Sequence, residues 1–167
     1  MKFANIKLGT DVEIETSSTV NNVQIGDNVK IAKRCSIFGS PERPLEIGAN
    51  SYIGMNCTMN GYLEKVIIGR NVSVAQNVHI MSDSGPNASL LLQKIYPIIV
   101  GPVFIGDHCW LGANVIIMPN VSLGDYCVVA ANSFVNRSFS SYSVIGGNPA
   151  KLIKVFSNEE INKMKGL

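Results

Sequence analysis

The sequence has little charge and no long apolar run, and both shortages exclude classes of function. Only 16% of its 167 residues are charged, the formal net charge is +2, and no run of Lys and Arg forms a basic patch. We therefore expect no nucleic-acid partner. No apolar stretch approaches the roughly 18 residues of a membrane span, and the opening "MKFANIKLGT" lacks the apolar core of a signal peptide. We expect a cytoplasmic protein without a membrane span, and the low charge suits a subunit that covers part of its surface with copies of itself.

Aliphatic side chains recur at every sixth position through most of the chain, which is the strongest pattern in the sequence. The positions are Ile25, Ile31, Ile37, Ile47, Ile53, Met59, Ile68, Val74, Ile80, Ile105, Leu111, Ile117, Leu123, Val129 and Val135. An earlier set, Leu8, Ile14 and Val20, is one residue out of phase. Gly often follows the aliphatic residue, Asn or Asp comes shortly after, and a small or β-branched residue stands four places on. We interpret each hexad as a short strand followed by a tight turn, whose backbone angles Gly or Asn supplies.

Two inward side chains per hexad, one large and one small, fill a narrow prism. Each interruption of the period comes after a third hexad, at 38–46, 60–67 and 81–104. Three hexads therefore make one coil, and the excursions leave from one corner. The sequence predicts an all-β fold: a triangular parallel β-helix of about six coils, in which 81–104 is a long protruding loop.

The predicted domain, 1–156, is followed by a short terminal segment, 157–167. Ser157 with Glu160 three residues later forms a capping box, which predicts a helix over 158–166. A solenoid needs a cap over the open end of its core, and we expect this helix to provide it.

The hexads, with "IGDHCWLGANVIIMPNVSLGDYCVVAANSFV" and "VIGGNPAKLIK", resemble the hexapeptide-repeat acyltransferases, above all those that acetylate sugars. The resemblance covers about 25–156 and is most specific over 105–154. It implies a left-handed coil, a homotrimer, and acetyl-coenzyme A (acetyl-CoA) bound between subunits. Spacing alone does not determine the handedness.

His79 is the candidate general base. It stands between the inward positions Val78 and Ile80, so its side chain points outward, and it directly precedes the loop 81–104. Family members carry a catalytic His at this level, often a few residues into the loop, where this sequence has no His. Either His79 deprotonates the acceptor with Asp83 orienting it, or the acceptor needs no base and His79 is an ordinary surface residue. A neutral imidazole suits a hydroxyl acceptor at cytosolic pH.

Trp110 also lies between two inward positions and points outward, where a neighbouring subunit or a ligand must cover it. The resemblance places this Trp, followed by Leu111 and Gly112, beside the acetyl-transfer site. It implies that the backbone N–H of Ala113 holds the thioester carbonyl, as an oxyanion hole does. It also implies a contact between the pantetheine arm and the backbone of Ala131. Trimer packing alone is the alternative for Trp110.

Three basic residues match family positions near the phosphates of the coenzyme: Arg137, Lys151 and Lys154. Each is alternatively an ordinary solvated charge. His108, in the turn "GDHC", is interpreted as a turn residue.

The four cysteines each occupy the small inward slot of a hexad, at Cys35, Cys57, Cys109 and Cys127. We therefore expect buried thiols of low reactivity, and no metal site.

Together these features predict an acetyl-CoA-dependent O-acetyltransferase that acts on a sugar or nucleotide sugar, with His79 as base. The alternatives are an N-acetyltransferase for an amino sugar nucleotide, serine or an antibiotic, and a non-catalytic β-helix scaffold.

Overall fold

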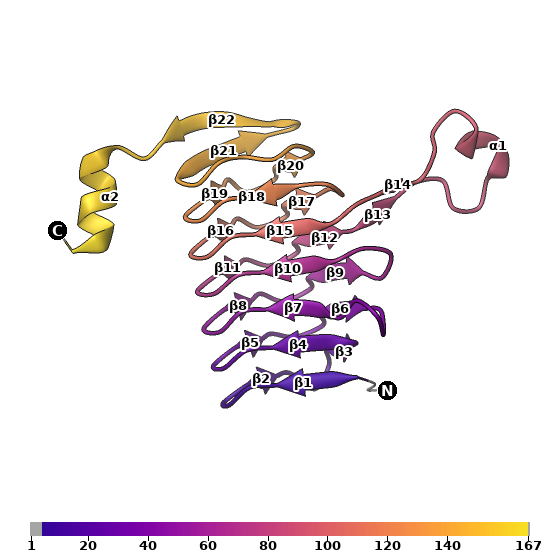
Figure 1. Cartoon of the computed structure of the whole chain (residues 1–167), viewed down its shortest axis with the longest axis horizontal. Helices are drawn as coiled ribbons and strands as arrows, with labels where there is room; N and C mark the ends of the chain where they lie inside the picture. The colour runs from indigo at the N-terminus through magenta and orange to yellow at the C-terminus, as the bar shows by residue number, and fades with distance from the viewer. Residues whose placement is uncertain (1–4, 167) are drawn as a thin grey trace.

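The computed structural model describes residues 5–166, which wind into a triangular prism of three parallel sheets (Figure 1). Face A consists of β1 (Ile6–Leu8), β4 (Val23–Ile25), β7 (Leu45–Ile47), β10 (Val66–Ile68), β15 (Val103–Ile105) and β18 (Ser122–Leu123). Face B begins with β2 (Glu13–Ile14), β5 (Lys30–Ile31), β8 (Tyr52–Ile53), β11 (Ser73–Val74), β16 (Trp110–Leu111) and β19 (Val128–Val129). Face C consists of β3 (Thr19–Asn21), β6 (Ser36–Gly39), β9 (Thr58–Gly61), β12 (His79–Met81), β17 (Ile116–Ile117) and β20 (Phe134–Val135).

Each coil contributes one strand to each face in the order A, B, C, so the predicted parallel β-helix of about six coils is confirmed. The earlier set of aliphatic residues forms the first coil, β1–β3. The left-handed sense of the β-helix remains an expectation from the resemblance. Residues 1–4 and 167, which the predicted domain boundaries include, lie outside the described residues.

The core is a single column inside the prism, and the period of six explains it. Every aliphatic position from Ile25 to Val135 in the repeat is at most 4% exposed. The small inward positions, from Val29 to Ser133, are buried as well. Alternation along each short strand then places the intervening side chains on the outside. The outer faces of the prism are therefore the surfaces available for function.

Non-glycine residues, most of them Asn as the sequence predicts, supply the turn angles of the hexads. Positive φ angles occur at the corners of most coils, for example at Asn50 (59°) and Asn114 (60°). Among residues 5–166, only Gly147 and Gly166 are glycines with positive φ, so the prediction that hexad glycines serve the turn angles is wrong. They allow close approach of neighbouring coils instead: a Cβ at Gly112 would lie 2.6 Å from the amide nitrogen of Ala131.

All three excursions leave from the corner between faces C and A, as the sequence predicts. They connect β6 to β7, β9 to β10, and β12 to β15. The longest contains an antiparallel pair, β13 (Asp83–Ser84) with β14 (Ile99–Val100), and a short helix, α1 (Leu90–Gln93). Figure 1 shows this arm projecting from the side of the prism. No residue of α1 is buried.

The C-terminal end differs from the prediction. β21 (Ser143–Gly147) extends face B and pairs antiparallel with β22 (Ala150–Val155), where Ile145 and Ala150 are buried. The capping box of Ser157 and Glu160 is present and begins α2 (Asn158–Lys165). However, α2 has no buried residue and lies beside the coils in Figure 1, so the predicted cap over the core is wrong. A helix with the sequence NEEINKMK has too few apolar residues to cover an open core. Within the described residues, no helix has the length and apolar character needed to cross a membrane.

Candidate functional site

His79 lies on the outer surface of face C, at the root of the arm. Its neighbours in register are Thr58 on β9 and Ile116 on β17, and its backbone N–H donates to the Val115 carbonyl over 2.9 Å. The imidazole is half-buried, while the residues before and after it are fully buried, so the predicted outward orientation is confirmed. Within residues 5–166 the ring makes no hydrogen bond or ion pair. The imidazole is therefore available to a bound molecule.

Asp83 makes no hydrogen bond or ion pair with His79 within the described residues. Its carboxylate Oδ1 accepts a hydrogen bond from Nδ2 of Asn60 over 2.9 Å. Asn60 is a polar residue at the site that the sequence analysis missed. It follows the last aliphatic residue of a coil, where the sequence shows only the start of an excursion, so no local signal distinguishes it.

Trp110 projects from face B and is 56% exposed, which confirms its predicted outward orientation. It stands in register between Ser73 and Val128. The indole and the His79 ring project from two different faces, which meet at the corner that Gly112 and Ala113 form. One chain therefore presents these two side chains in different directions and not into a shared cavity.

The corner between faces B and C offers free backbone amides. Within residues 5–166 the N–H groups of Ala113 and Ala131 donate no hydrogen bond. The equivalent corner positions of the preceding coils carry long side chains, at Lys33, Met55 and Gln76. Only small methyl groups stand beside the two amides of the later coils. We call this strip, Ala113 and Ala131, the amide strip.

The three basic residues expected near phosphates have different surroundings. The guanidinium of Arg137 lies 5.1 Å from the ring centre of Phe139. The ammonium of Lys154 forms an ion pair with Glu160 and lies 5.4 Å from the ring centre of Phe156. The contact with Lys154 is the larger cause of a lowered pKa of the Glu160 carboxyl, and a hydrogen bond from the Ser157 amide is the second. Lys151 is exposed on β22. Lys154 therefore already has a carboxylate partner, whereas Arg137 and Lys151 have no ion pair within the described residues.

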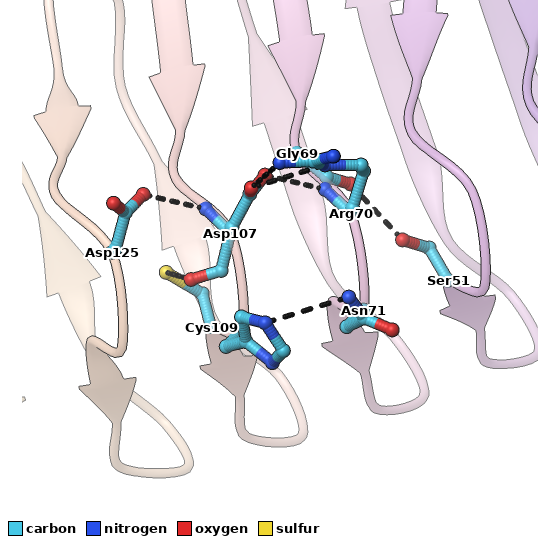
Figure 2. A network of polar contacts seen from close by, with 8 residues as sticks. Ser51, Gly69, Arg70, Asn71, Asp107, Cys109 and Asp125 are labelled. Carbon is cyan, nitrogen blue, oxygen red and sulfur yellow. Dashed lines mark hydrogen bonds and ion pairs between the residues drawn. The ribbon is translucent and has the colours of Figure 1, made fainter. Parts of the chain in front are cut away.

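A polar network at the corner between faces A and B is structural (Figure 2). Asp107 accepts from the backbone N–H of Arg70 at 2.8 Å and forms an ion pair with its guanidinium, also at 2.8 Å. These two contacts, in that order, hold the pKa of the Asp107 carboxyl below its ordinary value. The Asp107 amide in turn donates to Asp125. The network ties the turns of three successive coils to each other.

His108 belongs to the same corner and is a turn residue, as predicted. Its φ is 58°, and its ring stacks on Tyr126 with centres 4.8 Å apart; Tyr126 stacks on Tyr142 in turn. The stacked rings lie where other coils have Asn. This His is therefore used in the packing of the turns.

The cysteines are buried, as predicted. Cys57 and Cys109 each pack against a thiol of the neighbouring coil, and this thiol contact together with burial raises the pKa of both. A raised pKa keeps a thiol protonated and unreactive. Among residues 5–166, no three His, Cys, Asp or Glu side chains gather as a metal site would require.

A surface groove of about 460 Å³ lies on face A between β1 and β10, and another of about 620 Å³ lies on face B between β2 and β8. Neither is lined by any predicted site residue. The candidate site of the single chain is thus an open surface made of His79, Trp110 and the amide strip.

Two family models match the chain: bacterial transferase hexapeptide (six repeats) over residues 102–137, and hexapeptide repeat of succinyl-transferase over 44–82. A protein of Dictyostelium discoideum named an acetyltransferase is 40% identical over 71% of this chain and 64% of its own length. Galactoside O-acetyltransferase of Escherichia coli is 32% identical over 81% of this chain and 65% of its own. The chain thus spans slightly less than two thirds of these relatives.

Solved structures agree with the fold. A maltose O-acetyltransferase from Clostridium difficile has a TM-score of 0.63 and 26% identity, over 91% of this chain and 70% of that one. A variant of AntD, an N-acyltransferase from Bacillus cereus in complex with dTDP and coenzyme A, has a TM-score of 0.80 at 21% identity, over 96% and 89%. The repeat, the prism it forms and these matches together show a hexapeptide-repeat protein that is similar to bacterial transferases and to acetyltransferases.

Proposed function

We propose that the chain is an acetyl-CoA-dependent acetyltransferase acting on a small acceptor, most specifically on a hydroxyl of a sugar or nucleotide sugar. The observation that carries the proposal is the unpaired, outward imidazole of His79 at the root of the arm. His79 is in register with Ile116 on the next coil, three residues after Ala113 of the amide strip. The identity to galactoside O-acetyltransferase over 81% of the chain supports the acceptor class.

In this mechanism His79 accepts the proton of the acceptor hydroxyl while the hydroxyl oxygen attacks the thioester carbonyl. The N–H of Ala113 stabilises the negative charge that develops on the carbonyl oxygen. The C–O bond forms, the C–S bond breaks, and the imidazolium returns its proton to the leaving thiolate. No cysteine takes part, because all four thiols are buried. Trp110 covers the thioester end of the coenzyme, and Ala131, Arg137, Lys151 and Lys154 follow its pantetheine and phosphates.

We further propose that the enzyme is a homotrimer whose sites lie between subunits. In one chain Trp110 and His79 project from different faces, so a second copy is needed to enclose a bound thioester. The arm supports this assembly, because Leu90 and Leu91 are each 75% exposed and Ile95 is 73% exposed. Apolar side chains exposed to this degree on one loop are typical of a contact surface.

The second candidate is an N-acetyltransferase for an amino sugar nucleotide, and a specific observation favours it. His79 has no carboxylate partner within the described residues, and an amine delivered unprotonated attacks without a strong base. AntD, of similar fold, is an N-acyltransferase with a structure containing dTDP-4-amino-4,6-dideoxyglucose and coenzyme A. Serine and antibiotics remain alternative acceptors, and a scaffold without catalysis is the alternative outside enzymes.

The test combines coenzyme binding with transfer. Calorimetric titration of the purified chain with coenzyme A should show binding, and release of free thiol from acetyl-CoA should depend on the acceptor. The acceptor panel contains maltose, a galactoside, dTDP-4-amino-4,6-dideoxyglucose and chloramphenicol. Absence of coenzyme binding contradicts the proposal, and binding without transfer to any acceptor favours the scaffold.

A further inference from the structure

The root of the arm is held by one asparagine. The backbone carbonyl of Asn60 accepts the Ser82 amide at 2.8 Å, and its side-chain Oδ1 accepts the Tyr62 amide at 3.0 Å. Its Nδ2 donates to Oδ1 of Asp83 at 2.9 Å. Ser82, which is fully buried, also accepts the Glu64 amide through its hydroxyl. Asn60 therefore connects the excursion after β9 with the start of the arm.

These contacts determine the orientation of the Asn60 amide group. Because Tyr62 N–H donates to its oxygen, only the NH₂ group faces Asp83. The carboxylate is held at one oxygen, and within residues 5–166 its second oxygen has no hydrogen bond and the group has no ion pair. A carboxylate has about four acceptor positions. Asp83 thus presents a fixed, half-buried and unneutralised acceptor.

His79, on β12 of face C, and Asp83, on β13 of the arm, lie on either side of a bend at Ser82. Ile80 and Ser82 are buried, whereas residues 79, 81 and 83 are half-buried and each reaches the surface. Four residues of extended chain span at most about 14 Å. Within residues 5–166 no hydrogen bond or ion pair joins the two side chains: Asp83 is bonded to Asn60, and the His79 ring has no polar partner. A sugar ring with its substituents can lie between them, over Met81.

We propose that Asp83, positioned by Asn60, binds a hydrogen-bond-donating group of the acceptor, hydroxyl or ammonium, one sugar ring away from the group that His79 deprotonates. Asn60 is then a positioning residue that acts through Asp83. This inference rests on the proposed acetyltransferase function and assigns its acceptor two points of attachment. Asp83 recognises the acceptor, instead of orienting the imidazole.

The experiment compares Asn60→Ala, Asp83→Asn and the double variant with the wild type and with Thr19→Ala, an exposed outward residue of the same sheet on β3. Initial rates are measured on each acceptor of the panel and on glucose and glucosamine. These two sugars differ at one position, where glucose has a hydroxyl and glucosamine an amine. For each single variant we expect acceptor KM to rise about 10-fold, as for a lost hydrogen bond to a charged group. The kcat and the coenzyme A Kd should stay within about twofold. The double variant should be no worse than Asp83→Asn, because Asn60 acts only through the carboxylate.

The rates with glucosamine and with glucose identify which acceptor group donates a hydrogen bond to Asp83. A rise in KM for glucosamine alone assigns an ammonium to Asp83, and equal rises assign a hydroxyl. Melting temperatures are recorded for every variant, and Asp83→Asn, which keeps the shape of the side chain, tests the proposal even where Asn60→Ala fails to fold.

Three outcomes overturn the inference. Unchanged acceptor KM in folded Asp83→Asn, with transfer intact, removes it and leaves the proposed function standing. A loss of kcat with unchanged KM means that Asp83 acts on the base, as an orienting group does. If the wild type binds coenzyme A but neither binds nor acetylates any of these acceptors, the acceptor assignment and this inference fail together.

Discussion

The early coils (β4–β11) and the late coils (β15–β20) are built from the same hexad but differ on their surfaces. In the early coils the corner between faces B and C carries Lys33, Met55 and Gln76, and in the late coils it carries the amide strip. At the corner between faces A and B, Asn50 and Asn71 of the early coils are replaced by His108 and Tyr126. The cores of both regions are equally buried. The repeat therefore builds the scaffold, and the outward residues distinguish a supporting region from a candidate site.

Substitutions of the two histidines test the division between supporting region and candidate site most strongly. We expect the largest effect, on kcat, at His79. His79→Ala should lower kcat by about 10²–10⁴-fold, as loss of a general base does, and should leave coenzyme A affinity unchanged. His108→Asn, which restores the residue of the early coils, should retain kcat within about twofold. The measurement is steady-state kinetics with a hydroxyl acceptor. Near-wild-type turnover of His79→Ala would mean that the base is misassigned, whereas the same result with an amine acceptor would favour N-acetylation.

Glycine substitutions should show that the two regions are equivalent as scaffold. An alanine Cβ at Gly54 would lie 2.6 Å from the Ala75 carbonyl carbon, and one at Gly112 would lie 2.6 Å from the Ala131 amide nitrogen. Each substitution should therefore lower the free energy of unfolding by about 1–3 kcal/mol, measured by denaturant titration. A large difference between Gly54→Ala and Gly112→Ala would show that the coils are not equivalent.

Exchanging corner residues should separate the regions in coenzyme binding. Ala113→Met introduces beside the free amide the side chain that the early coils carry at the equivalent position, Met55. The substitution should weaken coenzyme A binding about 10-fold, the effect of roughly one lost hydrogen bond. Met55→Ala is the matched control and should leave the Kd unchanged. Calorimetric titration measures both. Equal affinities in the two variants would exclude the amide strip as the coenzyme site.

The smallest effect is expected at the exposed network that joins the two regions. Asp107→Asn should lower the free energy of unfolding by less than about 1 kcal/mol at neutral pH, because Arg70 is mostly exposed. In the folded state the hydrogen bonds from the backbone and side chain of Arg70 lower the pKa of Asp107 from its ordinary value. Its stabilisation is therefore complete above the ordinary carboxyl pKa and is lost as the pH falls through the lowered value. Denaturation curves of the two proteins should converge at acid pH; a constant difference would contradict this assignment.

The outward orientation of His79 and Trp110 was predictable because alternation along a strand depends only on the neighbouring inward residues. The burial of the cysteines followed from the same periodicity. The contact between Asn60 and Asp83 was not predictable, since it joins residues 23 positions apart through two irregular excursions. Neither excursion contains a repeat from which its path could be calculated. The position of α2 was also missed, because a capping box determines where a helix begins and says nothing about where it packs.

By itself the sequence determined the prism, its number of coils, its buried positions and the corner from which every excursion leaves. These features follow from local spacing, because each hexad repeats the same strand and turn. Only the tertiary structure decided that hexad glycines serve the contact between coils, that a β-hairpin and not a helix follows the last coil, and that Asp83 is held by Asn60. Each of these three features depends on contacts between residues that are distant in the sequence. The stacking distance of the coils and the path of the loops determine which residues come into contact.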